Sequence, residues 1–273
     1  MPVKIAVVGI GYWGSKLLRV FSGLDNCVVA AICEIDPIRV ASLRSHHPET
    51  SIETNYDNII NRADIDAVVI ALPPQLHFEY SQRALECGKH CFVEKPITTT
   101  TSEAQALIAM AETYNRRLMV GHTFEFHPAV RWIDDFIHSG DLGDVLHIFS
   151  QRMNLGIIRD DTDALWNLAP HDISMIFYWL HGELPKCVSC RGHSFLRRER
   201  NIIDMAWLTL EFESNAVAQV QVSWLSPEKI RQTMVVGSKR MVVFDDVSVE
   251  SKIKVFDKGV DRRPALENSE GYG

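Results

Sequence analysis

The chain has 273 residues, of which 46% are hydrophobic and 23% charged. This composition is near the average for globular proteins, which excludes disordered, collagen-like and disulfide-scaffold classes and leaves room for two modest domains. A formal net charge of -7 offers no broad basic surface to a nucleic acid, and no segment approaches the ~18 uninterrupted apolar residues of a membrane span.

The N-terminal apolar segment is short and leads directly into glycines, so it lacks the apolar region of a signal peptide. We therefore expect a cytoplasmic protein whose six cysteines stay reduced. Cys187 and Cys190 form a lone Cys-x-x-Cys in a segment with a strand pattern, where the two side chains point to opposite faces. No second Cys or His pair has metal-ligand spacing, so we predict no metal.

Short β-type segments alternate with longer helical ones over residues 1–122. Strands are predicted over residues 5–8, 28–33, 67–71, 90–93 and 118–121. Helical periodicity covers residues 13–21, 37–45, 75–87 and 101–115. Such alternation is typical of a parallel sheet wound with helices.

The pattern changes in residues 123–273. Helices are predicted near 129–139 and 170–180, and strands over 203–212, 216–224, 232–236, 241–245 and 253–256. In 216–224, apolar Ala218, Val220 and Val222 alternate with Gln219 and Gln221, which indicates a half-buried strand. We predict a second α/β domain, built on a largely antiparallel open sheet.

A glycine motif connects the first strand to the first helix. Gly9, Gly11 and Gly14 match Gly-x-Gly-x-x-Gly in the context that a dinucleotide site requires. The glycines allow a tight turn, close approach of a pyrophosphate, and close packing of helix on strand. This predicts that residues 1–122 form a Rossmann domain, the alternative being a purely structural glycine turn.

Glu34 ends the second predicted strand, where an acid accepts hydrogen bonds from the adenosine ribose. A carboxylate there repels a 2′-phosphate, and Asp36 adds negative charge, so we predict NAD rather than NADP as the cofactor. Arg39 is the nearest cation, and we expect it to stack on adenine or point to solvent. Tyr12 and Trp13 are expected either to flank the cofactor or to pack beneath the first helix.

Two later strand ends carry candidate chemistry. Leu72-Pro73-Pro74 and Glu94-Lys95-Pro96 are both expected at the carboxyl edge of the sheet, where open α/β folds bind ligands. A desolvated lysine ammonium there can polarise a hydroxyl or exchange its proton. A surface salt bridge between Glu94 and Lys95 is an equally good interpretation of these residues alone.

These motifs together resemble one family. The glycine motif, Pro73-Pro74 with His77, the segment from Gly88 to Pro96, Gly121-His122 leading to Phe126-His127-Pro128, and His171-Asp172 are similar to glucose-fructose oxidoreductase, inositol dehydrogenase and rhizopine-catabolism proteins. The resemblance covers almost the whole chain. It implies that Lys95 acts beside His171 on a hydroxyl proton while hydride passes to nicotinamide.

The resemblance also suggests the remaining contacts. The expected cofactor contacts beyond those above are Leu72, Pro73, His77, Glu94 and Lys95. The expected substrate contacts are Lys95, His122, Trp166, Asn167 and His171. The segment 165–172 looks most like members from surface-polysaccharide and nucleotide-sugar pathways.

Three departures from the family pattern stand out. Asn167 replaces an aspartate four residues before the histidine, so it can orient a substrate hydroxyl but cannot take its proton. Glu125 replaces the usual arginine, so we expect Arg152 or Arg159 to bind an anionic substrate group. Relatives usually continue through another strand and helix, so we expect the second domain to lack its usual C-terminal end, in a short member or a truncated chain.

We therefore expect an NAD-dependent oxidoreductase that acts on a hydroxyl carbon of a sugar, nucleotide sugar or cyclic polyol. One alternative is a regulator of the same fold that binds dinucleotide and ligand without turnover, which retention of Lys95 and His171 disfavours. Another is an enzyme with an imine or tetrapyrrole acceptor, because the fold does not fix the substrate. We expect a homodimer or homotetramer that associates through the second sheet, where Trp207 faces away from Ala206 and Leu208, the alternative being a packed helix layer over that face.

Overall fold

Six short apolar segments pair as a parallel sheet in the computed structural model, which describes residues 1–156, 158 and 162–260. They are β1 (Val3–Val8), β2 (Cys27–Cys33), β3 (Ser51–Glu53), β4 (Ala67–Ile70), β5 (His90–Val93) and β6 (Leu118–Val120). The strand order is β3-β2-β1-β4-β5-β6, the order of a dinucleotide-binding Rossmann sheet. The direction of strand order reverses between β1 and β4, and such switch points are where ligands bind.

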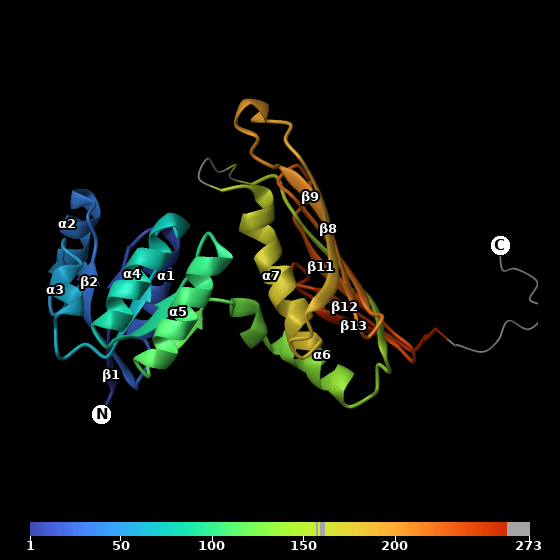
Figure 1. Cartoon of the computed structure of the whole chain (residues 1–273), viewed down its shortest axis with the longest axis horizontal. Coiled ribbons are helices and arrows are strands. Elements are labelled where there is room, and N and C mark those ends of the chain that lie inside the picture. The colour runs from blue at the N-terminus through green and yellow to red at the C-terminus, as the bar shows by residue number, and fades with distance from the viewer. Residues whose placement is uncertain (157, 159–161, 261–273) are drawn as a thin grey trace, which may run out of the picture. The chain divides into compact units, whose positions relative to one another are not determined.

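Helices cover both faces of this sheet (Figure 1). They are α1 (Tyr12–Ser22), α2 (Pro37–His46), α3 (Asp57–Ile60), α4 (Pro74–Glu86) and α5 (Thr101–Thr113). Because successive strand residues point to opposite faces, β1 supplies two cores. Ile5 and Val7 pack in the core beneath α1 and α2, whereas Ala6 and Val8 pack in the core with α3, α4 and α5.

Seven strands form the second sheet in the described part of the chain. They are β7 (Val145–Met153), β8 (Pro185–His193), β9 (Met205–Phe212), β10 (Val217–Ser223), β11 (Ile230–Gly237), β12 (Met241–Asp245) and β13 (Ile253–Phe256). Their order is β13-β12-β11-β7-β10-β9-β8, and only β7 and β10 pair in parallel. The chain divides into the units Met1–Gly121 and His122–Gly273, so each sheet belongs to a unit of its own.

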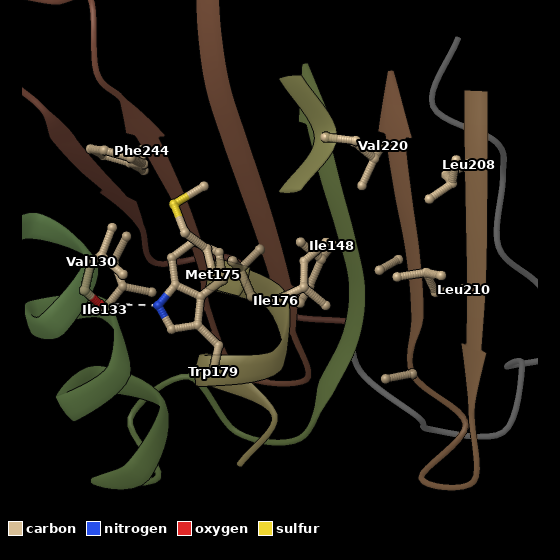
Figure 2. Packing of buried hydrophobic residues seen from close by; sticks show 14 of the residues in the cluster. Val130, Ile133, Ile148, Met175, Ile176, Trp179, Leu208, Leu210, Val220 and Phe244 are labelled. Atoms are coloured by element: carbon tan, nitrogen blue, oxygen red, sulfur yellow. Dashed lines mark hydrogen bonds between the residues drawn. The ribbon is translucent and has the colours of Figure 1, made fainter. Parts of the chain in front are cut away.

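One face of the second sheet is covered by two long helices (Figure 1). The helical segments of this unit are η1 (Thr123–Phe126), α6 (Pro128–His138), α7 (Ala164–Trp179) and η2 (Arg198–Arg200). Trp179 of α7 is buried between α6 and the sheet, and its indole Nε1 donates a hydrogen bond to the Val130 carbonyl at 3.0 Å (Figure 2). Ile148 and Val220 extend this core along β7 and β10.

The fold class expected from the sequence is confirmed, with differences in single elements. The sequence did not predict β3, α3 or β7, and the helix expected from residue 170 begins at Ala164 instead. Asp163 caps it, since the carboxylate accepts a hydrogen bond from the Trp166 N–H at 2.8 Å. Pro170 therefore lies inside α7 rather than at its start.

None of the helices in the described part of the chain has the length and apolar character needed to cross a membrane.

Candidate active site

The glycine loop between β1 and α1 is shaped by close backbone packing. Gly9 has a φ of +83°, and a Cβ there would lie 2.8 Å from Leu72 Cδ2. A Cβ on Gly14 would collide with the Gly9 carbonyl oxygen. At Gly11, by contrast, no described heavy atom lies within 4 Å of the Cβ position. The loop therefore leaves open space at Gly11, where a pyrophosphate needs to approach the backbone.

The N-terminus of α1 faces the same loop. Gly11 is its N-cap residue, and within the described residues no side chain caps it. The first-turn N–H groups of a helix need partners, and together with the helix dipole they favour an anion. Loop and helix thus fit the diphosphate of a dinucleotide.

Glu34 stands directly after β2 and is buried, with 5% of its surface exposed. Its carboxylate accepts hydrogen bonds from the backbone N–H groups of Ile10 at 2.7 Å and of Ile35 and Asp36 at 2.9 Å. The contact with Ile10 ties the end of β2 to the glycine loop. Glu34 is therefore held at the edge of the sheet beside the switch point.

Asp36 and Arg39 have local partners in the structure. The Asp36 carboxylate caps α2, accepting hydrogen bonds from the N–H groups of Ile38 and Arg39. The Arg39 guanidinium lies 3.6 Å from the Glu34 carboxylate and 3.8 Å from that of Asp36. The Arg39 side chain is 51% exposed, so these two carboxylates hold it near the end of β2 while it stays open to solvent.

Tyr12 and Trp13 lie on the first turn of α1 and are exposed, at 80% and 40%. Their rings stack at 5.9 Å between centroids, and the Lys16 ammonium lies 4.0 Å from the Tyr12 ring. Packing beneath the helix, one of the two expected placements, is therefore wrong.

Lys95 follows β5 at the same edge of the sheet. Its backbone N–H donates to the carboxylate of Glu94 at 3.3 Å. Burial raises the pKa of Glu94 above its ordinary value, against the opposing effect of the Lys95 N–H and ammonium. A Cβ on Gly121 would lie 3.1 Å from Glu94 Oε1, so only glycine leaves ordinary space for this carboxyl group.

His77 joins two of the loops at this edge. The ring is 1% exposed, with Nδ1 2.7 Å from the Pro96 carbonyl and Nε2 2.8 Å from the Leu72 carbonyl. Burial lowers the pKa of His77, while the two hydrogen bonds act in the opposite direction. Because both ring nitrogens contact backbone, His77 supports the loops that follow β4 and β5. This corrects its expected role as a direct cofactor contact.

Asn167 and His171 are four residues apart in α7, so they lie on one face of the helix. Both side chains are half-buried, whereas Trp166 is exposed. The longer α7 therefore carries three of the expected substrate contacts, namely Trp166, Asn167 and His171. His122, also expected there, precedes η1 and is half-buried.

Arg152 has a different role from the expected one. It is 3% exposed on β7, and its Nε and Nη2 donate to the two carboxylate oxygens of Asp172 at 2.7 and 3.2 Å. A guanidinium neutralised in this way is not an anion receptor, so the expected contact with an anionic substrate group is corrected. Arg159 lies outside the described residues. Burial raises the pKa of Glu125, the residue that replaces the family's arginine.

Sequence reasoning missed Phe124 and the partner of Arg152. Phe124 belongs to η1, and its ring centroid lies 5.3 Å from that of His171. Its only sequence signal was its place in the segment that follows His122. Asp172 was noticed as the neighbour of His171, but no pattern linked it to β7.

Two further features bear on the chemistry. Among the described residues, no group of three His, Cys, Asp or Glu side chains could hold a metal ion. All six cysteines are free, and Cys187 and Cys190 are exposed on β8.

Family models match most of the chain. Residues 3–122 match "Oxidoreductase family, NAD-binding Rossmann fold", and residues 130–243 match "GFO/IDH/MocA C-terminal domain". The chain is 27% identical over 265 residues to the UDP-N-acetylglucosamine 3-dehydrogenase of Acidithiobacillus ferrooxidans, covering 97% of this chain and 80% of that protein. It is 25% identical over 269 residues to the 2,7-anhydro-N-acetylneuraminate hydratase of Mediterraneibacter gnavus, covering 93% and 70%.

Solved structures share the fold. The scyllo-inositol dehydrogenase of Lactobacillus casei, with bound NAD(H) and scyllo-inositol, gives a TM-score of 0.81 at 19% identity, covering 92% of this chain and 78% of that one. With both domain models matched in order, the chain belongs to the NAD-binding oxidoreductase family of glucose-fructose oxidoreductase, inositol dehydrogenase and rhizopine-catabolism proteins.

Proposed function

We propose that the protein is an NAD-dependent dehydrogenase that moves hydride between nicotinamide and a hydroxyl carbon of a sugar, nucleotide sugar or cyclic polyol. The observation that carries this proposal is Lys95, which follows β5 at the sheet edge that also holds the open glycine loop. Relatives named for dehydrogenation of UDP-N-acetylglucosamine and inositol support the substrate class.

The cofactor site is proposed from the loop geometry. Gly9, Gly11 and the first turn of α1 hold the diphosphate, Glu34 holds the adenosine ribose, and Leu72 and Pro73 line the adjoining loop. When bound, NAD supplies the hydride acceptor. Tyr12 and Trp13, both exposed beside the loop, contribute aromatic surface to the same site.

The proton is handled by the chain's own side chains. Lys95 Nζ polarises the substrate hydroxyl, and His171 accepts or returns its proton at neutral pH. Asn167, one helical turn before His171, orients a neighbouring hydroxyl through its amide. Trp166 and His122 complete the substrate contacts.

A lysine substitution tests the function. Lys95→Met should lower kcat by about 100- to 10,000-fold on any substrate that the wild type turns over, because it removes the ammonium. The measurement follows NADH formation with a panel that includes UDP-N-acetylglucosamine and scyllo-inositol. The control is Lys4→Met, which removes an exposed ammonium near the start of β1, at the opposite edge of the sheet from Lys95. Turnover by Lys95→Met within a few-fold of wild type would make Lys95 structural.

Cofactor preference is tested separately. We expect the Glu34 and Asp36 carboxylates to disfavour a 2′-phosphate despite the Arg39 guanidinium beside them, so NADH should bind on the order of 100-fold more tightly than NADPH. Calorimetric titration of the two cofactors measures this ratio, and Glu34→Gln should reduce it. Equal or tighter binding of NADPH would show that Glu34 does not hold the ribose.

A further inference from the structure

A buried ion pair links α7 to the sheet directly beside His171. Asp172 is 1% exposed and Arg152 3%, and the guanidinium contacts both carboxylate oxygens. Ser150 Oγ donates to the same carboxylate at 2.7 Å and lies 2.8 Å from Thr233 Oγ1 on β11. The helical turn that carries His171 is thereby tied to two adjacent strands, β7 and β11.

Phe124 extends this arrangement to the imidazole. The Arg152 guanidinium lies 4.5 Å from the centroid of the Phe124 ring, and the His171 ring lies 5.3 Å from it at an interplanar angle of 59°. The His171 carbonyl also accepts a hydrogen bond from Ser174 Oγ at 3.0 Å. Contacts therefore run from the sheet through Arg152 and Phe124 to the histidine ring.

Stability alone is a poor reason for such a pair. Removing two charges from water costs free energy that their mutual attraction barely offsets. Hydrophobic residues of similar volume often stabilise a fold equally well. What a paired guanidinium supplies beyond this is fixed geometry, because its planar donors match a carboxylate in one orientation. A fixed orientation matters next to a group that must meet a substrate hydroxyl.

We propose that Arg152, Asp172 and Phe124 are positioning residues that fix the orientation of the His171 ring. This inference rests on the proposed function only for its catalytic consequence. The ring orientation itself is a property of the protein alone.

The test compares single and paired substitutions. Arg152→Met and Asp172→Leu each leave a buried charge without its partner, and each should lower Tm by roughly 10 °C. The double variant removes both charges, and its Tm should return to within a few degrees of wild type. Arg62→Met with Asp64→Leu removes an exposed pair that also has two parallel hydrogen bonds, and serves as the control.

The decisive readout is the imidazole NMR signal of His171, assigned by its loss in His171→Asn. In the double variant this signal should shift although Tm has recovered, and kcat should fall about 100-fold with a smaller change in KM. A double variant with the wild-type Tm, His171 signal and kcat would overturn the proposal, since the pair would then have no part in orienting His171.

Phe124→Leu provides a second route that leaves the ion pair intact, in case the double variant does not fold. It should change the nuclear Overhauser contacts of the His171 ring with its neighbours, which loss of the Phe124 ring current alone does not do, while Phe124→Tyr should retain them. Unchanged contacts of the His171 ring in Phe124→Leu would overturn the proposal. Failure of the proposed function has a different signature: the wild type turns over no substrate of the panel, while the His171 signal still responds to these variants.

Discussion

Glu94 carries a buried carboxyl group at the expected active site. Its pKa is raised chiefly by burial, so the lost hydration outweighs the favourable charge of Lys95. A folded-state pKa above the unfolded value means that the folded protein binds the proton more tightly. Stability from the neutral carboxyl is therefore complete below the ordinary pKa of 4.5 and is lost as pH rises through the folded-state pKa.

Glu94→Gln should consequently raise Tm at neutral pH, because the amide keeps an acceptor for the Lys95 N–H without a buried charge. The difference from wild type should shrink as pH falls below 4.5, where both proteins are neutral at this position. Thermal unfolding at several pH values measures this, with Glu112→Gln on the exposed face of α5 as control. A lower Tm at neutral pH would mean that the carboxylate is stabilised by its surroundings.

Individual residues also mark how far sequence reasoning reaches. The glycine positions were predictable because each answers a local backbone need that their spacing reveals. The partners of Arg152 and His77 were not predictable, because Asp172 and the Leu72 and Pro96 carbonyls approach them only after the chain has folded. Arg152 therefore seemed available to bind an anionic substrate group, although Asp172 neutralises its charge in the folded protein.

At the scale of elements, β7 is a strand that the sequence pattern did not predict. Its helix-facing residues include Ser150 and Arg152, both buried and polar, so the strand lacks the apolar alternation of a half-buried strand. α7 was shortened in the prediction for a similar reason, since Pro170 suggests a helix start. The Asp163 cap and the packing of Ala164 and Ala169 instead extend the helix past the proline.

The second sheet carries a prediction about assembly. The face that α6 and α7 leave uncovered presents apolar side chains, among them the half-buried Phe149 on β7 and Met234 on β11 and the exposed Trp207 on β9. We expect this face to pair with a second copy, because exposed apolar surface of this kind marks association sites. Trp207→Glu should reduce the mass measured by light scattering toward that of one chain, while Ile108→Glu on α5 should not. A wild type that is monomeric at micromolar concentrations would contradict the assembly.

At the scale of the whole molecule, the two units supply different halves of the proposed chemistry. The first unit carries the glycine loop, Glu34 and Lys95, and the second carries Asn167 and His171. The domain order and both fold types followed from periodicity and motifs, because these are repeated over many residues. The substrate could not be predicted in this way, since one family includes relatives named as dehydrogenases and as a hydratase.

Transfer of deuterium from substrate to cofactor measures the proposed hydride step itself. UDP-N-acetylglucosamine and scyllo-inositol, each deuterated at its carbon-bound positions, are incubated separately with the protein and NAD, and the cofactor is analysed by mass spectrometry. Deuterium from one of these substrates should appear in the nicotinamide ring of NADH, and Lys95→Met should nearly abolish this transfer. Tight binding of NAD and of a sugar with no deuterium in the cofactor would contradict the proposed hydride step, and would identify the chain as a binding protein.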